Sequence, residues 1–274
     1  MKLQEVVDYY KKQSPQISEL IDFFYRTYQL QDQYTGKISP VLSLTADTAI
    51  QKLQSGQYLL EGVHWTVNSD IFKNIIGDLL ATLKSQGEKS EGLEKVISNI
   101  SAPIPSTFPE LLKNATKPGI KLTAPESETL IYLLWQTLKV FYRKEAEQFS
   151  AIDYLQYWLK PICPVCGGLP KISQLQKDSG KRFLFCHLCC TQWSVHRIGC
   201  PFCGNTSNDT LAYFYADGNR GYRVDVCNIC RKYIKTIDEN TLGRETIPEL
   251  EDFITYNLDI LAVSEGYQKS LNLL

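Results

Sequence analysis

The stretch CPVCGGLP at residues 163–170 and the related stretch CPFCGN at residues 200–205 each place two cysteines three positions apart, beside a proline and a glycine. In such a turn both thiolates can face one ion, and the glycine allows the positive φ angle that the backbone needs there. The C-x-x-C pattern occurs four times within 68 residues, in the pairs Cys163/Cys166, Cys186/Cys189, Cys200/Cys203 and Cys227/Cys230. Two such turns supply the four sulfurs of a tetrahedral site for zinc or for a single iron ion. The sequence therefore predicts two four-cysteine metal sites.

The spacing of the pairs predicts which of them share an ion. Nineteen residues separate Cys166 from Cys186, and 23 separate Cys203 from Cys227, so each stretch is long enough for a hairpin. Joining the outermost pairs instead would close a loop of about 60 residues, at a larger cost in chain entropy. We therefore expect the first pair to join the second, and the third to join the fourth. Because this cost grows slowly with loop length, the spacing favours this pairing over the swapped one but does not prove it.

The remaining candidate ligands fit this scheme less well. Cys190 directly follows Cys189, so its side chain should point away from the ion; we expect a spare thiol, with an auxiliary redox role as the alternative. His187 and His196 lie close to the turns and could replace a cysteine, but eight thiolates already fill two sites. A thioredoxin-type redox pair would need a βαβ context, which is missing around these turns. We expect the ions to have a structural role, with a redox role as the alternative.

Cysteines and charges are unevenly distributed along the chain. All nine cysteines lie within residues 163–230, and the first 162 residues contain none. Unpaired clustered thiols are typical of metal proteins of a reducing compartment, so we expect the cytoplasm. Residues 163–235 carry ten Lys and Arg against four Asp, a net charge of +6, whereas the rest of the chain carries −7.

This basic segment suggests an alternative function. With aromatic residues such as Trp193, Phe202, Tyr213 and Tyr215, it could form the stacking, cationic face of a nucleic-acid-binding zinc ribbon. Two divalent ions held by four thiolates each would, however, lower the charge of the segment to roughly +2, a weak basic footprint for a nucleic-acid binder. We therefore consider nucleic acid an unlikely partner.

The flanking sequence is predicted to be helical. Before the first cysteine, apolar residues between Phe72 and Leu83 recur at helical spacing, and Thr123 with Glu126 forms a capping box ahead of another apolar stripe. We expect six or seven helices there, and a further one over residues 152–159 that Pro161 ends. At the other end of the chain, Thr246 with Glu249 predicts a C-terminal helix that Gly266 caps, packed back on the rest of the protein.

Between these helical parts, β-prone runs at residues 182–185, 211–215 and 222–226 are separated by Gly, Asn and Asp, which predicts short strands with tight turns. The predicted fold class is mainly α with a small β portion. The expected domains are an all-α domain over residues 1–160, two tandem four-cysteine modules over 161–195 and 196–240, and the C-terminal helix within 241–274.

Composition and motifs exclude several classes of protein. Of 274 residues, 43% are hydrophobic and 22% charged, which predicts a globular chain, not a disordered one. No apolar run reaches the ~18 residues of a membrane helix, and the start MKLQEVVDYYKKQ lacks the features of a signal peptide. We find no phosphate-binding glycine loop, no G-x-S-x-G, no H-E-x-x-H and only three histidines, so we expect no enzyme.

The cysteine segments resemble those of the FdhE family of formate dehydrogenase formation, or accessory, proteins. The resemblance rests on CPVCGGLP at 163–170, CHLCCTQW at 186–193, RIGCPFCG at 197–204 and DVCNICRKYIK at 225–235, and on the tail EDFITYNLDILAVSEGY at 251–267. It covers nearly the whole chain, although the motifs of the helical part are weak. All eight paired cysteines match the family pattern. Cys190 departs from it, since a polar or acidic residue is usual there.

The resemblance implies a fold and a function. The fold would be an α-helical domain followed by two rubredoxin-like or zinc-ribbon-like modules that hold iron or zinc. The protein would act in the cytoplasm in the maturation of formate dehydrogenase, and would contact the molybdenum- or tungsten-containing catalytic subunit before that enzyme is active or exported. Iron in the rubredoxin-like modules would leave electron transfer as a second alternative function.

Overall fold

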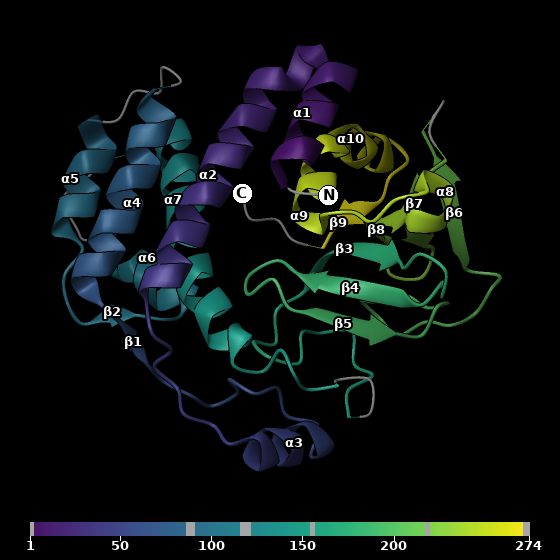
Figure 1. Cartoon of the computed structure of the whole chain (residues 1–274), viewed down its shortest axis with the longest axis horizontal. Helices are drawn as coiled ribbons and strands as arrows, with labels where there is room; N and C mark the ends of the chain where they lie inside the picture. Colours follow the sequence, from purple (N-terminus) through teal and green to yellow (C-terminus); the bar gives the residue numbers. More distant parts are fainter. Residues whose placement is uncertain (1–2, 86–90, 116–121, 154–156, 217–219, 271–274) are drawn as a thin grey trace. The chain divides into compact units, whose positions relative to one another are not determined.

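The computed structural model describes residues 3–85, 91–115, 122–153, 157–216 and 220–270 (Figure 1). These residues form two compact units. One unit comprises the described residues of 25–43 and 62–148, and the other those of 1–24, 44–61 and 149–272. The chain passes between the units within helix α2 (Ser18–Lys37) and in the segments around residues 43, 61 and 148.

The first of these units is helical. Besides the later part of α2, it contains the following elements: β1 (Thr66–Val67), α4 (Ser69–Lys84), α5 (Glu91–Asn99), β2 (Ile104–Pro105), α6 (Phe108–Ala115) and α7 (Ala124–Glu147). The predicted apolar stripe forms the buried face of α4, where Phe72 stacks on Phe141 of α7 with 6.4 Å between the ring centroids. The predicted capping box is confirmed, because Thr123 accepts from Glu126 N and Thr123 N donates 2.9 Å to the Glu126 carboxylate.

The other unit is built on a mixed sheet. Its strands are β3 (Pro170–Leu175), β4 (Arg182–Cys186), β5 (Gln192–Val195), β6 (Leu211–Tyr215), β7 (Tyr222–Cys227), β8 (Lys232–Asp238) and β9 (Gln268–Lys269). They lie in the order β5-β4-β3-β8-β7-β6, with β9 beside β8. Each half of the cysteine region supplies one antiparallel three-stranded meander, and β3 pairs with β8 in parallel, with Ser173 opposite Thr236. The two halves therefore share one continuous sheet.

Helices complete this unit: α1 (Leu3–Gln13), a 3₁₀ turn (Pro15–Ile17), α3 (Ala46–Gln54), α8 (Glu239–Leu242), α9 (Pro248–Ile254) and α10 (Tyr256–Ser264). Alternate residues of a strand face opposite sides of a sheet, so β7 buries Tyr222, Val224 and Val226 in a core with Leu258 of α10. Helix α1 joins this core at Tyr10, whose hydroxyl donates 2.8 Å to the fully buried carboxylate of Glu251 on α9.

Several local predictions are corrected by the structure. The C-terminal helix is two helices, α9 and α10, that meet at Thr255. Thr246 caps neither, because its N–H and hydroxyl bond the Glu239 carboxylate at 2.7 and 2.9 Å, and α9 begins after Ile247. Gly266 does follow the end of α10, with a φ of +82°.

The helix predicted over residues 152–159 is absent from its described part, residues 152–153 and 157–159; residues 154–156 lie outside the described residues. Trp158 instead donates 2.8 Å from its indole N–H to Ile162 O. The helices and mixed sheet agree with an α-rich fold with a smaller β portion. The domain boundaries at residues 160, 195 and 240 stay predictions. None of the described helices has the length and apolar character needed to cross a membrane.

Candidate metal centres

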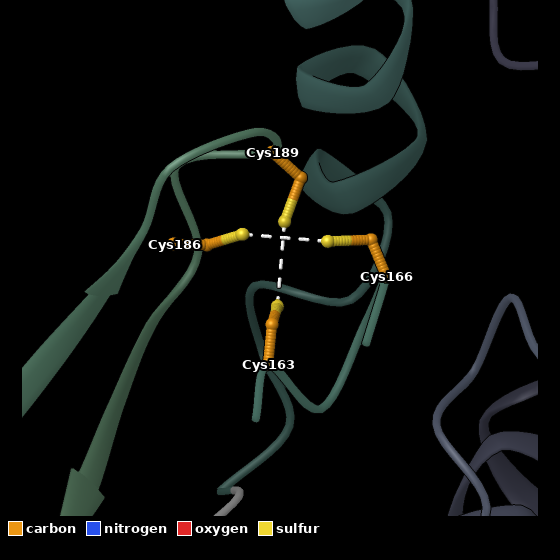
Figure 2. Close-up of side chains that lie close together, drawn as sticks. All are labelled: Cys163, Cys166, Cys186 and Cys189. Atoms are coloured by element: carbon orange, nitrogen blue, oxygen red, sulfur yellow. Dashed lines mark hydrogen bonds between the residues drawn. The ribbon is translucent and has the colours of Figure 1, made fainter. Parts of the chain in front are cut away.

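The eight paired cysteines lie in two clusters of four. Within each cluster the sulfur atoms all lie within 4.8 Å of one another. The first centre consists of Cys163, Cys166, Cys186 and Cys189, and the second of Cys200, Cys203, Cys227 and Cys230. The grouping is the one that the loop-closure argument favours; that these residues bind metal stays a prediction. Figure 2 shows the four side chains of the first centre pointing toward one another from two separate turns.

All four turns have the same backbone design. In all four, the residue after the second cysteine has the positive φ that this turn requires. In three of them, its N–H donates to the carbonyl of the first cysteine. Gly167 N donates 3.0 Å to Cys163 O, Gly204 N 3.1 Å to Cys200 O, and Arg231 N 2.9 Å to Cys227 O. The four equivalent φ angles are +71° at Gly167, +60° at Cys190, +74° at Gly204 and +57° at Arg231.

This design accounts for the position of Cys190. The residue occupies the left-handed backbone position that glycine fills after the first and third turns, and it belongs to neither cluster. The expectation that Cys190 does not join the ion-binding set therefore agrees with the described geometry. His187 belongs to neither cluster; its Nδ1 lies 2.9 Å from Leu169 O, and a hydrogen bond from its side chain helps to lower the pKa of Cys186.

The first centre is enclosed by protein. Its sulfurs lie 3.4 Å apart between Cys163 and Cys189, and 3.3 Å apart between Cys166 and Cys186. The backbone N–H groups of Gly168 and Leu188 point at sulfurs from 3.4 Å each. A segment far away in the sequence braces the first turn: Leu59 N and Leu60 N donate 2.9 Å to the carbonyls of Pro164 and Val165. Nothing in the sequence pattern around residues 58–60 indicates this contact.

The second centre is more open. Its sulfurs lie 3.6 Å apart between Cys200 and Cys230, and 3.7 Å apart between Cys203 and Cys227. Cys203 is exposed and Cys230 half-buried, whereas three cysteines of the first centre are buried. Asn205 reaches Cys227 Sγ with its amide from 3.6 Å, in addition to donating 2.7 Å to Thr210. The asparagine that follows CPFCG thus belongs to the surroundings of this centre.

The sulfur geometry fits a tetrahedral ion. Zinc–sulfur bonds of ~2.3 Å at tetrahedral angles require sulfurs ~3.8 Å apart. The sulfur–sulfur distances given above, from 3.3 to 3.7 Å, leave room for such an ion in both centres with small adjustments. Four sulfur ligands suit zinc and a single iron equally, so the ligand set does not decide between them.

Crowding separates the pKa values of the thiols. Hydrogen bonds with Cys163, Cys186 and Cys189 raise the pKa of Cys166 well above its usual value. Burial also raises the pKa of Cys186, but hydrogen bonds from the other three thiols outweigh it and hold this pKa well below the usual value.

In the second centre, burial raises the pKa of Cys200. Burial has the same effect on Cys227, but the N–H groups of Cys230 and Ile229 outweigh it and bring that pKa to about 7. Each centre thus contains one thiol that ionises readily, and a bound cation would displace the remaining protons.

Comparisons with known proteins agree with one another. A family model described as "FdhE, central domain" matches residues 162–197, which contain the whole first centre. A "Protein FdhE homolog" of Aquifex aeolicus (strain VF5) is 37% identical over 115 residues, which are 41% of this chain and 40% of that protein. A "Protein FdhE homolog" of Enterobacter sp. (strain 638) is 26% identical over 215 residues, 76% of this chain and 66% of that protein. The chain thus matches less than two thirds of the length of either relative.

A solved structure is similar over nearly the whole chain. The crystal structure of the FdhE protein from Pseudomonas aeruginosa superposes with a TM-score of 0.62 over 94% of this chain and 89% of that one. At 19% sequence identity, this similarity shows that the fold is shared.

Proposed function

We propose that the chain is an accessory protein for the maturation or activation of formate dehydrogenase, because the family model and the curated relatives indicate the FdhE family and the solved FdhE structure shares the fold. The observation that carries the proposal is the first centre, where the family match coincides with four converging cysteines. We propose that the chain acts in the cytoplasm, docks the catalytic subunit and catalyses no reaction itself.

Two described clusters of buried charged side chains hold elements of the fold together. Buried Glu251 is held by Tyr10, Tyr222 and Arg244, at 2.8, 2.5 and 2.9 Å. Buried Lys235 is held between two aspartates of the C-terminal helices. Groups that are tied to one another across elements stabilise the fold.

The eight cysteines would hold two ions, one in each centre. A bound zinc ion would act only as a cross-link, whereas a bound iron ion would also exchange one electron. Metal analysis and a visible spectrum of anaerobically purified protein distinguish these roles. We expect two equivalents of metal; a colourless preparation that contains only zinc would eliminate the redox role and the rubredoxin-like electron carrier, and leave docking unaffected.

Docking is tested by co-purification. The tagged, metal-loaded chain is mixed with the formate dehydrogenase catalytic subunit of the same organism, and the bound fraction is measured at increasing salt. We expect the subunit to co-purify with the native chain, and to be lost when the first centre is disrupted by Cys166→Ser. A catalytic subunit that fails to bind, and becomes active at the same rate without this chain, would refute the proposed function. Retention on an RNA or DNA column would instead favour the nucleic-acid alternative.

A further inference from the structure

A cavity lies beside the second centre, with Cys200 and Cys227 in its lining. It has a volume of about 260 Å³ and is lined by residues of β4, β6, β7 and β8 and by the chain around Cys200. We name it the basic cavity after its principal side chains: Arg182, Arg197, Arg223, Lys232, Phe202 and Tyr213. Arg223 and Asp225 alternate along β7 with the core residues Val224 and Val226, so the basic cavity lies on the sheet face opposite the core formed with α10.

Charge in the basic cavity is unbalanced. Four cationic side chains line it with a single carboxylate, Asp225. That carboxylate is already occupied: it lies 3.1 Å from Arg182, 2.8 Å from Arg223 Nε, and accepts 2.7 Å from Thr236. Arg182 is saturated in turn by Ser173 Oγ and Gly199 O at 2.9 and 2.8 Å.

Arg223 and Lys232 are cations of the basic cavity that retain free donors. Arg223 lies with its guanidinium 4.7 Å over the Tyr213 ring, and Lys232 lies 5.7 Å over the Phe202 ring. In the part of the chain that the structure describes, the Nη atoms of Arg223 have no acceptor and Lys232 has no carboxylate partner. Each cation lies over an aromatic ring, and this contact reduces the side-chain freedom that would be lost when an anionic group binds.

An exposed strand edge borders the same cavity. Within the described residues, β6 pairs with β7 alone, so one edge of Leu211–Tyr215 carries unpaired backbone groups. The strand reads LAYFY, with no proline or charge of the kind that usually protects an edge, and Tyr213 is 57% exposed. An edge of this kind binds extended peptides through main-chain hydrogen bonds.

From these observations we propose that the basic cavity and the edge of β6 together bind an extended protein segment with a carboxylate flanked by apolar side chains. The segment would add a strand beside β6 and extend its carboxylate over that strand into the basic cavity, where Arg223 and Lys232 supply the cationic donors. The amount of charge favours a peptide over nucleic acid. Four cations, one carboxylate and a neighbouring ion–thiolate centre of about −2 leave roughly +1, which matches one carboxylate and not a chain of phosphates.

The test uses defined probes and the metal-loaded full chain. A rhodamine-labelled, acetylated heptapeptide of alternating valine and threonine with one central glutamate is titrated by fluorescence anisotropy. Two matched peptides carry glutamine in place of the glutamate, or N-methyl groups on alternate backbone nitrogens. A single-stranded uridine decamer is the nucleic-acid probe. We expect the glutamate peptide to bind, the glutamine peptide to bind about tenfold more weakly, and the N-methylated peptide to lose binding.

Protein variants locate the site. Arg223→Gln and, independently, Lys232→Gln should each weaken the glutamate peptide about tenfold. Lys181→Gln, which removes an exposed cation outside the cavity, should leave binding unchanged. If Arg223→Gln fails to fold because Asp225 loses a partner, Lys232→Gln and the altered peptides still test whether the basic cavity binds the carboxylate.

Four outcomes would each overturn the proposal: no binding of the glutamate peptide, equal binding of the glutamine peptide, tighter binding of the uridine decamer, or a dimer of the free chain that the peptide does not dissociate. The last would show that a second copy occupies the edge. No formate dehydrogenase enters the assay, so its failure would leave the proposed function standing.

Discussion

At the residue scale, the residue after each C-x-x-C pair has a positive φ, and this backbone conformation limits which side chains fit there. Cys190 has a φ of +60°, in the left-handed region that costs a residue with a Cβ about 1 kcal/mol. We therefore predict that Cys190→Gly leaves the metal content at two ions and changes the free energy of unfolding by less than ~1 kcal/mol, because relief of strain offsets the added entropy of the unfolded chain.

The matched variant is Gly167→Ala, at the equivalent position of the first turn. A Cβ there would lie 2.7 Å from the Tyr58 ring, so both the φ of +71° and the contact oppose it. We expect Gly167→Ala to destabilise the protein by more than Cys190→Gly, as measured by urea unfolding and metal analysis. Loss of an ion from Cys190→Gly would instead show that this thiol is a ligand.

Replacement of Lys235 on β8, which is 2% exposed, should also change the stability of the fold. Its Nζ lies 2.9 Å from Asp252 and 2.7 Å from Asp259, on α9 and α10. Lys235→Met would leave two aspartates without their principal partner, so we predict a loss of about 3 kcal/mol in the free energy of unfolding. Lys269→Met removes a more exposed cation 3.1 Å from Asp259 and should cost less than ~1 kcal/mol.

The unfolding of these variants is best measured at pH 7. Burial raises the pKa of Asp252, but the charges of Lys235, Lys171 and Lys269 outweigh it and hold the pKa well below the usual carboxyl value. A lowered pKa means that the pairing stabilises the fold fully above the unfolded value of about 3.9, and that this contribution is lost as the pH falls below it. Equal stabilities of the two variants at pH 7 would contradict the role of Lys235.

At the scale of elements, the two centres should differ in how easily they release metal. Buried cysteines and the brace from Leu59 and Leu60 enclose the first centre, whereas the second has an exposed Cys203 and adjoins the basic cavity. We predict that a chelator removes one equivalent of metal before the other, and that iodoacetamide then modifies Cys203 before Cys166. Mass spectrometry of a Cys190→Gly variant measures the order in which the two cysteines are modified, without a contribution from Cys190. Equal modification of Cys203 and Cys166 would contradict the prediction.

The elements also show where sequence reasoning succeeds. The stripe of α4, the capping box of α7 and the strands β4, β6 and β7 follow from local periodicity and local hydrogen bonds, and all were predictable. The spacing to Glu249 predicts that Thr246 caps a helix, but its hydroxyl bonds Glu239, a residue earlier in the chain. A nonlocal carboxylate that competes for a capping side chain leaves no mark in the spacing, and the prediction failed there for that reason.

At the scale of the whole molecule, the cysteine grouping was accessible from spacing, but the joint sheet was not. Loop lengths limit which turns can meet, whereas the parallel pairing of β3 with β8 depends on how two meanders dock after each has formed. The brace from Leu59 and Leu60 is of the same nonlocal kind. Both centres lie in the same compact unit, and these contacts connect them within it.

This shared sheet determines how much of the structure should unfold when one centre is lost. The coupling of a four-cysteine zinc site to folding amounts to ~10–16 kcal/mol, which matches or exceeds the ~5–15 kcal/mol that stabilises a typical domain. Cys163→Ser should therefore unfold more than the first turn: without β3 and β4, strand β8 loses its parallel partner and the core with α10 loses Ile172 and Phe185. We predict that hydrogen exchange, followed by mass spectrometry, shows lost protection throughout β3–β8, while α4 and α7 of the helical unit stay protected. Cys190→Ser is the control that removes a thiol outside both centres. If β7 and β8 keep their protection in Cys163→Ser, the halves of the sheet fold independently; if α4 and α7 lose theirs together with the strands, the two compact units fold as one.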